Sequence, residues 1–337
     1  MQYLIMVSFL FLLAAFPAPS ALSDTIEPAS QAKANEYEYP HPPSDRFEST
    51  FEVTAGYRKD SIEWNIAGNL MGTDPNILSE LNWNNIDIFL LGLTYRANIG
   101  KHVYFRSHLD YGIVFDGDNQ DSDYNGDNRT DEFSRSLNGV DGNNVWDGSI
   151  GIGPRFLFSE SAIAVCPLIG YAIFEQDYNI IDGNQVVSAP PSTMPIGPFG
   201  GLDSRYQTRW TGPWLGIDLL LSIPITQRSL SAVVVRLTGE YHRIDFDAEA
   251  NWNLRSDFSH PVSFTQEAEG SGFTAGASIL WELKNRLGVH AGISFKEMTA
   301  KDGVDRTYFA DGSTADTRLN EVRWRALALE AGFAYVF

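Results

Sequence analysis

Long runs in which apolar residues alternate with polar or small ones dominate the chain. From Leu327 to Phe337 every second residue is apolar, and most of the residues between them are small or charged. Residues 286–296 and 102–115 repeat the pattern, with Ser107 as an exception on the apolar face of the second run. Because successive side chains in a strand point to opposite faces, each run predicts a β-strand with one apolar and one polar face.

Two architectures satisfy such two-faced strands, a soluble sandwich and a membrane barrel. A sandwich buries its apolar faces between two sheets, whereas a membrane barrel turns them to lipid and keeps its polar faces in the lumen. The runs here are much longer than the roughly five or six residues of an average soluble strand. Their connections alternate between short and long, and the last strand ends in Phe337, similar to the C-terminal signature of bacterial outer-membrane proteins. These features predict the barrel.

The alternating runs predict an all-β fold, an antiparallel transmembrane barrel of ten strands within residues 46–337. Bacterial single-chain barrels have an even number of strands, with short periplasmic turns and long extracellular loops, so both ends of the barrel are expected in the periplasm. The predicted strands are 47–67, 79–98, 101–117, 144–159, 161–182, 206–226, 229–251, 264–283, 286–302 and 321–337. The predicted turns are 99–101, 159–161, 226–228 and 284–285, and the predicted loops are 68–78, 118–143, 183–205, 252–263 and 303–320.

The N-terminal residues 1–23 predict a signal peptide. Leu4–Phe16 is almost wholly apolar but shorter than the about 20 residues of a transmembrane helix, and Ala21 and Ser23 suit cleavage before residue 24. Residues 24–45 are polar and contain prolines, which predicts a flexible periplasmic lead-in. No later stretch reaches the about 18 apolar residues of a membrane helix. We therefore expect export to the outer membrane of a Gram-negative-type bacterium.

The overall charge excludes some classes of partner. Asp and Glu number 43 against 24 Lys and Arg, and the resulting net charge of −19 argues against nucleic-acid binding. The single cysteine, Cys166, excludes an internal disulfide and a Cys-x-x-Cys metal site. The partners that remain are outer-membrane lipid and an unidentified protein or host ligand.

The polar faces of the strands predict a lumen closed by ion pairs. A ten-stranded barrel is only slightly wider than an eight-stranded one, in which side chains fill the interior, so charges of both signs inside it should pair. A narrow porin-like channel is the alternative. We interpret the histidines of this face as packing residues rather than metal ligands. The charged or ionisable residues predicted to point inward include Arg96, Arg106, His108, Asp110, Asp147, Arg155, Asp218, Arg236, Glu240, His242, Glu282, His290, Lys296 and Glu330.

One acidic stretch, DSDYNGDNRTDE at residues 121–132, matches the spacing of an EF-hand calcium loop. Oxygen-bearing side chains occupy its first, third and fifth positions, a glycine the sixth and a glutamate the twelfth. Predicted strands rather than helices flank it, and Arg129 brings a cation toward the site. Two interpretations remain, a weakly bound Ca²⁺ that orders the loop or a solvated acidic loop. The candidate ligands are Asp121, Asp123, Asn125, Asp127 and Glu132.

The same aspartates, placed after the third predicted strand, resemble part of a known site. Asp121-Ser-Asp123, Thr130-Asp-Glu132 and the stretch LSELNW at residues 78–83 are similar to segments of the omptins. Omptins are ten-stranded outer-membrane barrels, and barrels of this kind include chlamydia-related outer-membrane proteins. The resemblance in strand count and loop rhythm covers residues 47–337. It implies a barrel that stands well above the membrane, where an aspartate pair and an Asp-His pair activate water across a groove.

The second half of the omptin site has no counterpart at the expected place. The resemblance puts the Asp-His pair at the top of the seventh strand, where residues 251–253 are Asn-Trp-Asn, and amides cannot act as a base at neutral pH. His260 in the next loop and His242 lower on the strand are outside candidates. The leading hypothesis is a surface barrel without proteolytic activity that acts through its extracellular loops. An omptin-type endopeptidase that uses Asp121, Asp123 and an unconventional histidine is the alternative enzyme.

The resemblance also implies a lipid partner. Omptins bind lipopolysaccharide through basic residues on the outer wall, and Arg323 and Arg325 lie at a suitable height on the last strand. The net charge of −19 provides no broad basic belt around them.

Overall fold

The computed structural model describes residues 48–159, 162–225 and 229–337, all of which belong to one compact unit, Pro40–Phe337. The predicted signal peptide (1–23) and lead-in (24–45) lie outside the described residues, as do the predicted turn 226–228 and most of the turn 159–161. In the described part of the chain, no helix has the length and hydropathy needed to cross a membrane.

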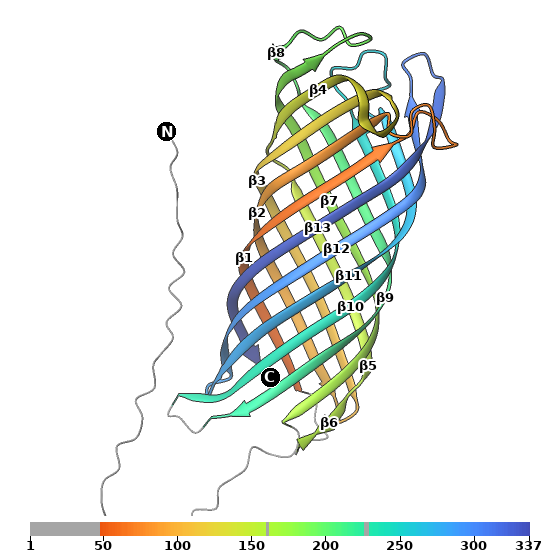
Figure 1. Cartoon of the computed structure of the whole chain (residues 1–337). Coiled ribbons are helices and arrows are strands. Elements are labelled where there is room, and N and C mark those ends of the chain that lie inside the picture. Colours follow the sequence, from red (N-terminus) through yellow and green to blue (C-terminus); the bar gives the residue numbers. More distant parts are fainter. Residues whose placement is uncertain (1–47, 160–161, 226–228) are drawn as a thin grey trace, which may run out of the picture. The chain divides into compact units, whose positions relative to one another are not determined.

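The strands form one antiparallel sheet that closes into a barrel (Figure 1). A short 3-10 helix, Asp127–Arg129, lies between two of them. The strands are β1 Glu48–Ile66, β2 Ser79–Ile99, β3 Val103–Gly126, β4 Thr130–Val140, β5 Asn144–Pro154, β6 Phe156–Phe158, β7 Ile163–Ser188, β8 Gly197–Pro198, β9 Ser204–Pro224, β10 Leu230–Asn251, β11 Phe264–Leu283, β12 Leu287–Tyr308 and β13 Thr314–Val336.

The barrel wall has ten strand positions, which confirms the predicted number. The 13-stranded sheet follows the order β2-β1-β13-β12-β11-β10-β9-β7-β4-β3-β5, and the pairing of β2 with β3 closes the ring. Both β4 and β5 pair with β3 on one side and with β7 on the other, so they form two parts of one wall strand. The short β6 and β8 pair only with β7 and add no position.

Two of the predicted loops are largely strand. The loop expected at 118–143 is a hairpin in which β3 continues to Gly126 and β4 returns from Thr130. The loop expected at 303–320 is likewise a hairpin, because β12 continues to Tyr308 and β13 begins at Thr314. These stretches lost the apolar alternation on which the prediction rested. The backbone ladder nevertheless continues above the membrane, where no apolar outer face is needed.

The outer face of the barrel carries an apolar belt with a sharp upper edge. On β1, Phe51, Val53 and Tyr57 are exposed, and the outward residues above them are the polar Lys59, Ser61 and Glu63. On β13 the exposed leucines Leu327 and Leu329 lie below Arg325. Such a belt on a closed barrel is the surface that contacts lipid. The end with short connections and both barrel termini is therefore periplasmic, and the long-loop end is extracellular.

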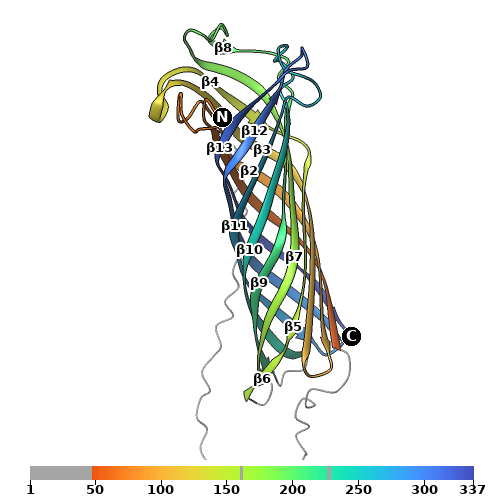
Figure 2. The same ribbon diagram turned by 90° about the vertical axis from the view of Figure 1, so that its right-hand side faces the viewer.

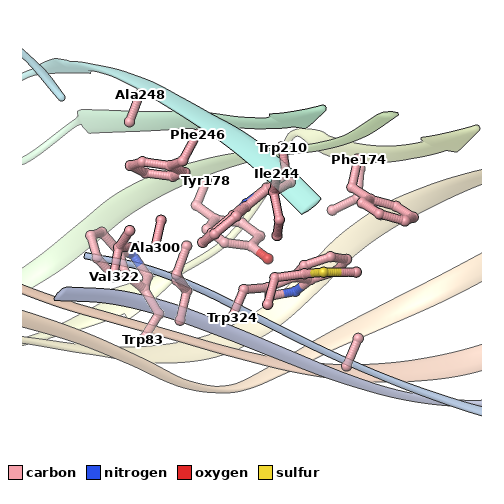
Figure 3. Packing of buried hydrophobic residues seen from close by; sticks show 14 of the residues in the cluster. Trp83, Phe174, Tyr178, Trp210, Ile244, Phe246, Ala248, Ala300, Val322 and Trp324 are labelled. Carbon is pink, nitrogen blue, oxygen red and sulfur yellow. The ribbon is translucent and has the colours of Figure 1, made fainter. Parts of the chain in front are cut away.

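At the same height, the inner face of the barrel changes from charged residues below to apolar residues above. Along β1 the inward residues Glu52, Arg58 and Asp60 are ionic, and those above them, Ile62 and Trp64, are apolar and buried. Figure 3 shows side chains from many strands meeting in this upper interior. The barrel thus has an ionic lumen within the membrane and an aromatic core above it. We call this core the aromatic plug; its large side chains include Trp64, Trp83, Trp210, Trp324, Tyr178, Tyr206, Phe174, Phe246 and Phe264.

The predicted salt-bridge network fills the lower lumen. Glu52 forms a salt bridge with Arg236 at 2.6 Å and a second one with Arg96. Arg106 lies 2.8 Å from Asp218. A second group joins Arg58 to Asp60 and, at 2.9 Å, to Asp147, which also pairs with Lys296. A polar cavity of about 120 Å³ remains between these groups.

The cavity does not make the interior an open pore. At its edge, Asp110, Asp147 and His290 each keep one buried polar atom that has no hydrogen-bond partner among the described residues, which is the environment of ordered water. Above it, Trp210 and Trp324 have no exposed surface. The described side chains therefore favour the plugged lumen over the porin-like channel.

Candidate functional site at the extracellular end

The two aspartates of the acidic stretch lie on strand β3 and face the interior of the barrel top. In the β-ladder, Asp121 lies between Leu81 of β2 and Ser136 of β4, and Asp123 lies two residues further up the strand. Leu81 is buried in the aromatic plug, which fixes the inward direction of this face. Both aspartates remain half-buried. They therefore face the barrel interior beside the plug.

The five predicted calcium ligands are not gathered around one point. Asp121 to Asn125 belong to the extended strand β3, whereas an EF-hand loop must wrap around its ion. Asp127 instead accepts a hydrogen bond of 2.7 Å from the backbone of Asn76, and Glu132 pairs with Arg135 at 2.7 Å. Among the described residues, no group of three or more His, Cys, Asp or Glu side chains could hold a metal ion. Calcium stays a prediction that the hairpin geometry does not support.

Burial and mutual repulsion set the protonation of the aspartate pair. Burial raises the pKa of Asp121 well above its ordinary value, and the nearby charge of Asp123 raises it further. Burial also raises the pKa of Asp123, against hydrogen bonds from Ser79 and Ser134. Arg255 opposes both increases through its positive charge. Asp121 therefore keeps its proton to a higher pH than an ordinary aspartate does.

The loop after β10 supplies the side chains that face the aspartates. Trp252 hydrogen bonds to Asp121, and its ring meets Phe264 of the aromatic plug edge-on at 4.8 Å. Arg255 forms two hydrogen bonds with Asp257, at 2.9 and 2.8 Å. The opposite wall therefore presents an indole and a guanidinium group, neither of which can take a proton from water at neutral pH.

Neither candidate histidine lies beside the aspartates. His260 is exposed, and its Nδ1 lies 2.8 Å from Oδ1 of Asn251. His242 is buried lower in the barrel, with Nε2 3.0 Å from Glu240 and its ring against Phe174 and Trp214. The largest influences on the pKa values of Asp121 and Asp123 come from other groups.

The sequence predicted the aspartate side of the barrel top and part of the side that faces it. Residues 251–253 were expected to face the aspartates, and Trp252 does so. Asn253 instead ties two loops together, because it accepts a hydrogen bond of 3.0 Å from the backbone of Asp203 and donates one of 2.7 Å to Gly201. Arg255 was missed because its approach to the aspartates depends on the path of the loop.

The outer-wall arginines proposed for lipopolysaccharide are already paired. Arg323 contacts Glu63 at 3.3 Å and Glu321 at 2.5 Å, and Arg325 contacts Glu297 at 3.0 Å. The pairs with Glu63 and Glu297 join neighbouring strands, the pair with Glu321 lies within β13, and all three lie above the apolar belt. Each guanidinium group therefore has a carboxylate as its nearest charged neighbour.

Comparisons with known proteins agree with this architecture. The family model of the Protochlamydia outer membrane protein matches residues 52–337. The chain belongs to this family. No curated protein sequence matches the chain.

Solved structures show which folds this family member is similar to. The outer membrane protease OmpT from Escherichia coli is similar with a TM-score of 0.67 and 13% identity, over 86% of this chain and 97% of that chain. The outer membrane protein OprG from Pseudomonas aeruginosa has a TM-score of 0.32 and 10% identity, over 88% and 98% of the two chains. The OmpT likeness confirms the predicted omptin-like fold and, at this identity, shows the fold alone.

A buried carboxyl in the upper wall gives a prediction about pH. Asp305 is 2% exposed and accepts a hydrogen bond of 2.9 Å from Gln266 Nε2. Burial of this carboxyl group raises its pKa from 3.8 to about 7. Between these values the folded state holds a proton that the unfolded state releases, so stability falls as pH rises and levels off above pH 7. Asp305→Asn should therefore increase the free energy of unfolding at pH 8 by at most a few kcal/mol, which raises the unfolding temperature. At pH 4 the same substitution should leave the unfolding temperature nearly unchanged.

The control for this prediction is Asp311→Asn, at an exposed loop position. Thermal unfolding followed by circular dichroism at pH 4, 6 and 8 separates the two variants. A gain for Asp305→Asn that is equal at all three pH values would contradict the assigned titration.

Proposed function

We propose that the protein is a non-proteolytic surface barrel that binds a protein ligand through its extracellular loops. The observation that carries this proposal is the pair of side chains that act on Asp121 and Asp123, Trp252 and Arg255. Trp252 and Arg255 stand where water activation needs a base, and both candidate histidines are hydrogen bonded elsewhere. Among the described residues, these two neighbours favour a binding module over the alternative peptidase, which needs a base beside Asp121 and Asp123.

The loop tips support a binding role. Met71 is 81% exposed and Ile196 is 63% exposed, and Leu70 and Leu254 are also exposed on the same end of the barrel. Exposed apolar side chains on loops of a rigid scaffold are typical of protein-binding surfaces. Lipopolysaccharide binding by Arg323 and Arg325 stays a prediction, since both arginines already pair with glutamates.

A single peptide-library experiment tests this proposal. The purified barrel in lipid nanodiscs is incubated with the library, and mass spectrometry reads both retained intact peptides and new fragments. We expect retained intact peptides and no fragments above the level of Asp121→Asn/Asp123→Asn. Leu70→Ser/Met71→Ser should weaken retention by about tenfold or more, the weight of one or two buried apolar contacts. Cleavage that disappears in the double aspartate variant would overturn the proposal.

A further inference from the structure

The apolar belt contains a groove that the proposed function does not use. Its volume is about 470 Å³, and it is a shallow hollow that is open on the side facing lipid. It lies on the lipid-facing wall across β1, β2, β3, β5 and β7; β5 and β7 are labelled in Figure 2. The outward-facing residues that line it include Phe51, Leu93, Tyr95, Ser107, Leu109, Gly148, Ile150, Tyr171 and Ile173.

Two small residues hollow the groove. Ser107 interrupts the apolar outward face of β3, and Gly148 does the same on β5 between Trp146 and Ile150. The ladder places Leu109 opposite Gly148 and Ser107 opposite Ile150, so the two small positions are diagonal neighbours on adjacent strands. The groove is therefore built into the sequence at two positions rather than left between loosely packed side chains.

Large side chains form both rims of the groove. Tyr95 of β2 lies opposite Ser107, and Ile173 of β7 lies opposite Gly148. Further along the β7 rim, Tyr171 is 52% exposed. These side chains form a wall on each side of the groove. The surface of the groove is almost wholly apolar. An apolar chain would gain about 25 cal/mol for each Å² that it buries there beyond what a flat wall offers.

The position of the groove identifies its occupant. It is continuous with the belt that contacts membrane lipid, so acyl chains are the molecules that meet it. Tyr95 lies four residues from Ile99 at the periplasmic end of β2, roughly 13 Å along the strand. The turn that follows carries Lys101 and His102, both exposed. A phospholipid of the periplasmic leaflet would place its phosphate near this turn while its acyl chain lies in the groove.

We infer that this wall is a binding site for a phospholipid of the periplasmic leaflet. The acyl chain fills the groove over Ser107 and Gly148, and the phosphate interacts with Lys101. The site is independent of the extracellular loops and of the proposed loop function. It would fix one lipid at a defined place on the barrel.

Native mass spectrometry of the purified barrel in detergent tests this inference. The probe is phosphatidylglycerol, added in increasing amounts, and the readout is the concentration at which one lipid stays bound. Ser107→Leu/Gly148→Leu fills the groove and should raise that concentration at least tenfold. Lys101→Glu, in the exposed turn, should raise it several-fold.

The matched control is Gly239→Leu/Ala275→Leu, a pair of small outward positions that face each other on β10 and β11. It adds similar apolar bulk to another part of the belt and should leave lipid binding unchanged. Circular dichroism confirms that each variant is folded. Equal lipid binding by the wild type and the groove variant would overturn the inference, as would an unaffected Lys101→Glu variant. Preferential retention of lipid A over phosphatidylglycerol would also overturn it.

Discussion

Replacing Arg58 with methionine is expected to lower the free energy of unfolding by about 3–5 kcal/mol, the usual effect of removing one partner of a buried ion pair. Arg58 is 1% exposed and donates to Asp60 at 2.6 Å and to Asp147 at 2.9 Å. Methionine fills a similar volume but leaves two buried carboxylates with less compensation. Lys296 still reaches Asp147, so Asp60 becomes the more costly of the two groups. Equilibrium unfolding in urea, with the barrel in lipid vesicles, measures the change.

The control for Arg58→Met is Arg243→Met. Arg243 lies 3.1 Å from Glu269, but the two side chains are 75% and 73% exposed, so water screens their interaction. Its loss should cost less than about 1 kcal/mol. Adding Asp60→Asn to Arg58→Met should recover part of the lost stability, because the uncompensated charge is then removed. Similar losses for the two arginine variants would contradict the assigned role of the lumen network.

The wall of the barrel could be predicted because alternation fixes two faces for every strand. The number of wall strands and the short turns follow from that pattern, and so does the ionic lumen with Arg106, Asp147 and Lys296. Arg58 and Asp60 were missed from the lumen even though they lie in the correct register on β1. The hairpin at Gly126 was missed because its acidic residues have no apolar alternation, while its structure depends on backbone pairing to β2 and β7.

The aromatic plug could not be predicted because alternation does not say which face meets water. Within the membrane the apolar face of each strand points outward to lipid. Above the membrane the apolar face points inward to the plug, and the polar face points outward to water. On β10, Tyr241 faces lipid and the next outward residues, Arg243 and Asp245, face solvent. On the inner face, His242 is followed by the buried Ile244. Only the height of the membrane edge, which the sequence does not mark, decides where the exchange occurs.

The candidate site was predictable in part for a similar reason. Asp121 and Asp123 were assigned to the barrel top from their place after the third predicted strand, and they lie at the top on the longer strand β3. Their protonation and their neighbours depend on a loop from the far side of the ring, and Arg255 reaches them only in three dimensions. The spacing of residues 121–132 matches a calcium loop, but spacing alone does not say whether the backbone curls around an ion. Here residues 121–126 belong to the extended strand β3.

Truncating one side chain of the aromatic plug should have an effect as large as breaking the ion network. Trp324 has no exposed surface, packs against Phe174 and Trp210 at ring distances of 5.4 and 6.2 Å, and donates a 3.0 Å hydrogen bond to Asp60. Trp324→Ala is expected to lower the free energy of unfolding by about 3–5 kcal/mol, because it removes buried apolar surface and leaves a cavity. Asp60 keeps Arg58 and so limits the electrostatic part of the loss.

The comparison that isolates the plug is Trp281→Ala, since Trp281 points outward from β11 and is 36% exposed. Lipid or water refills the space it leaves, so no closed cavity forms and the loss should be less than half that of Trp324→Ala. Urea unfolding of both variants in the same lipid vesicles gives the difference directly. If the two tryptophans cost the same, the upper interior would not be a packed core, and the stability of the extracellular half would have to come from the lumen ion pairs and the backbone ladder alone.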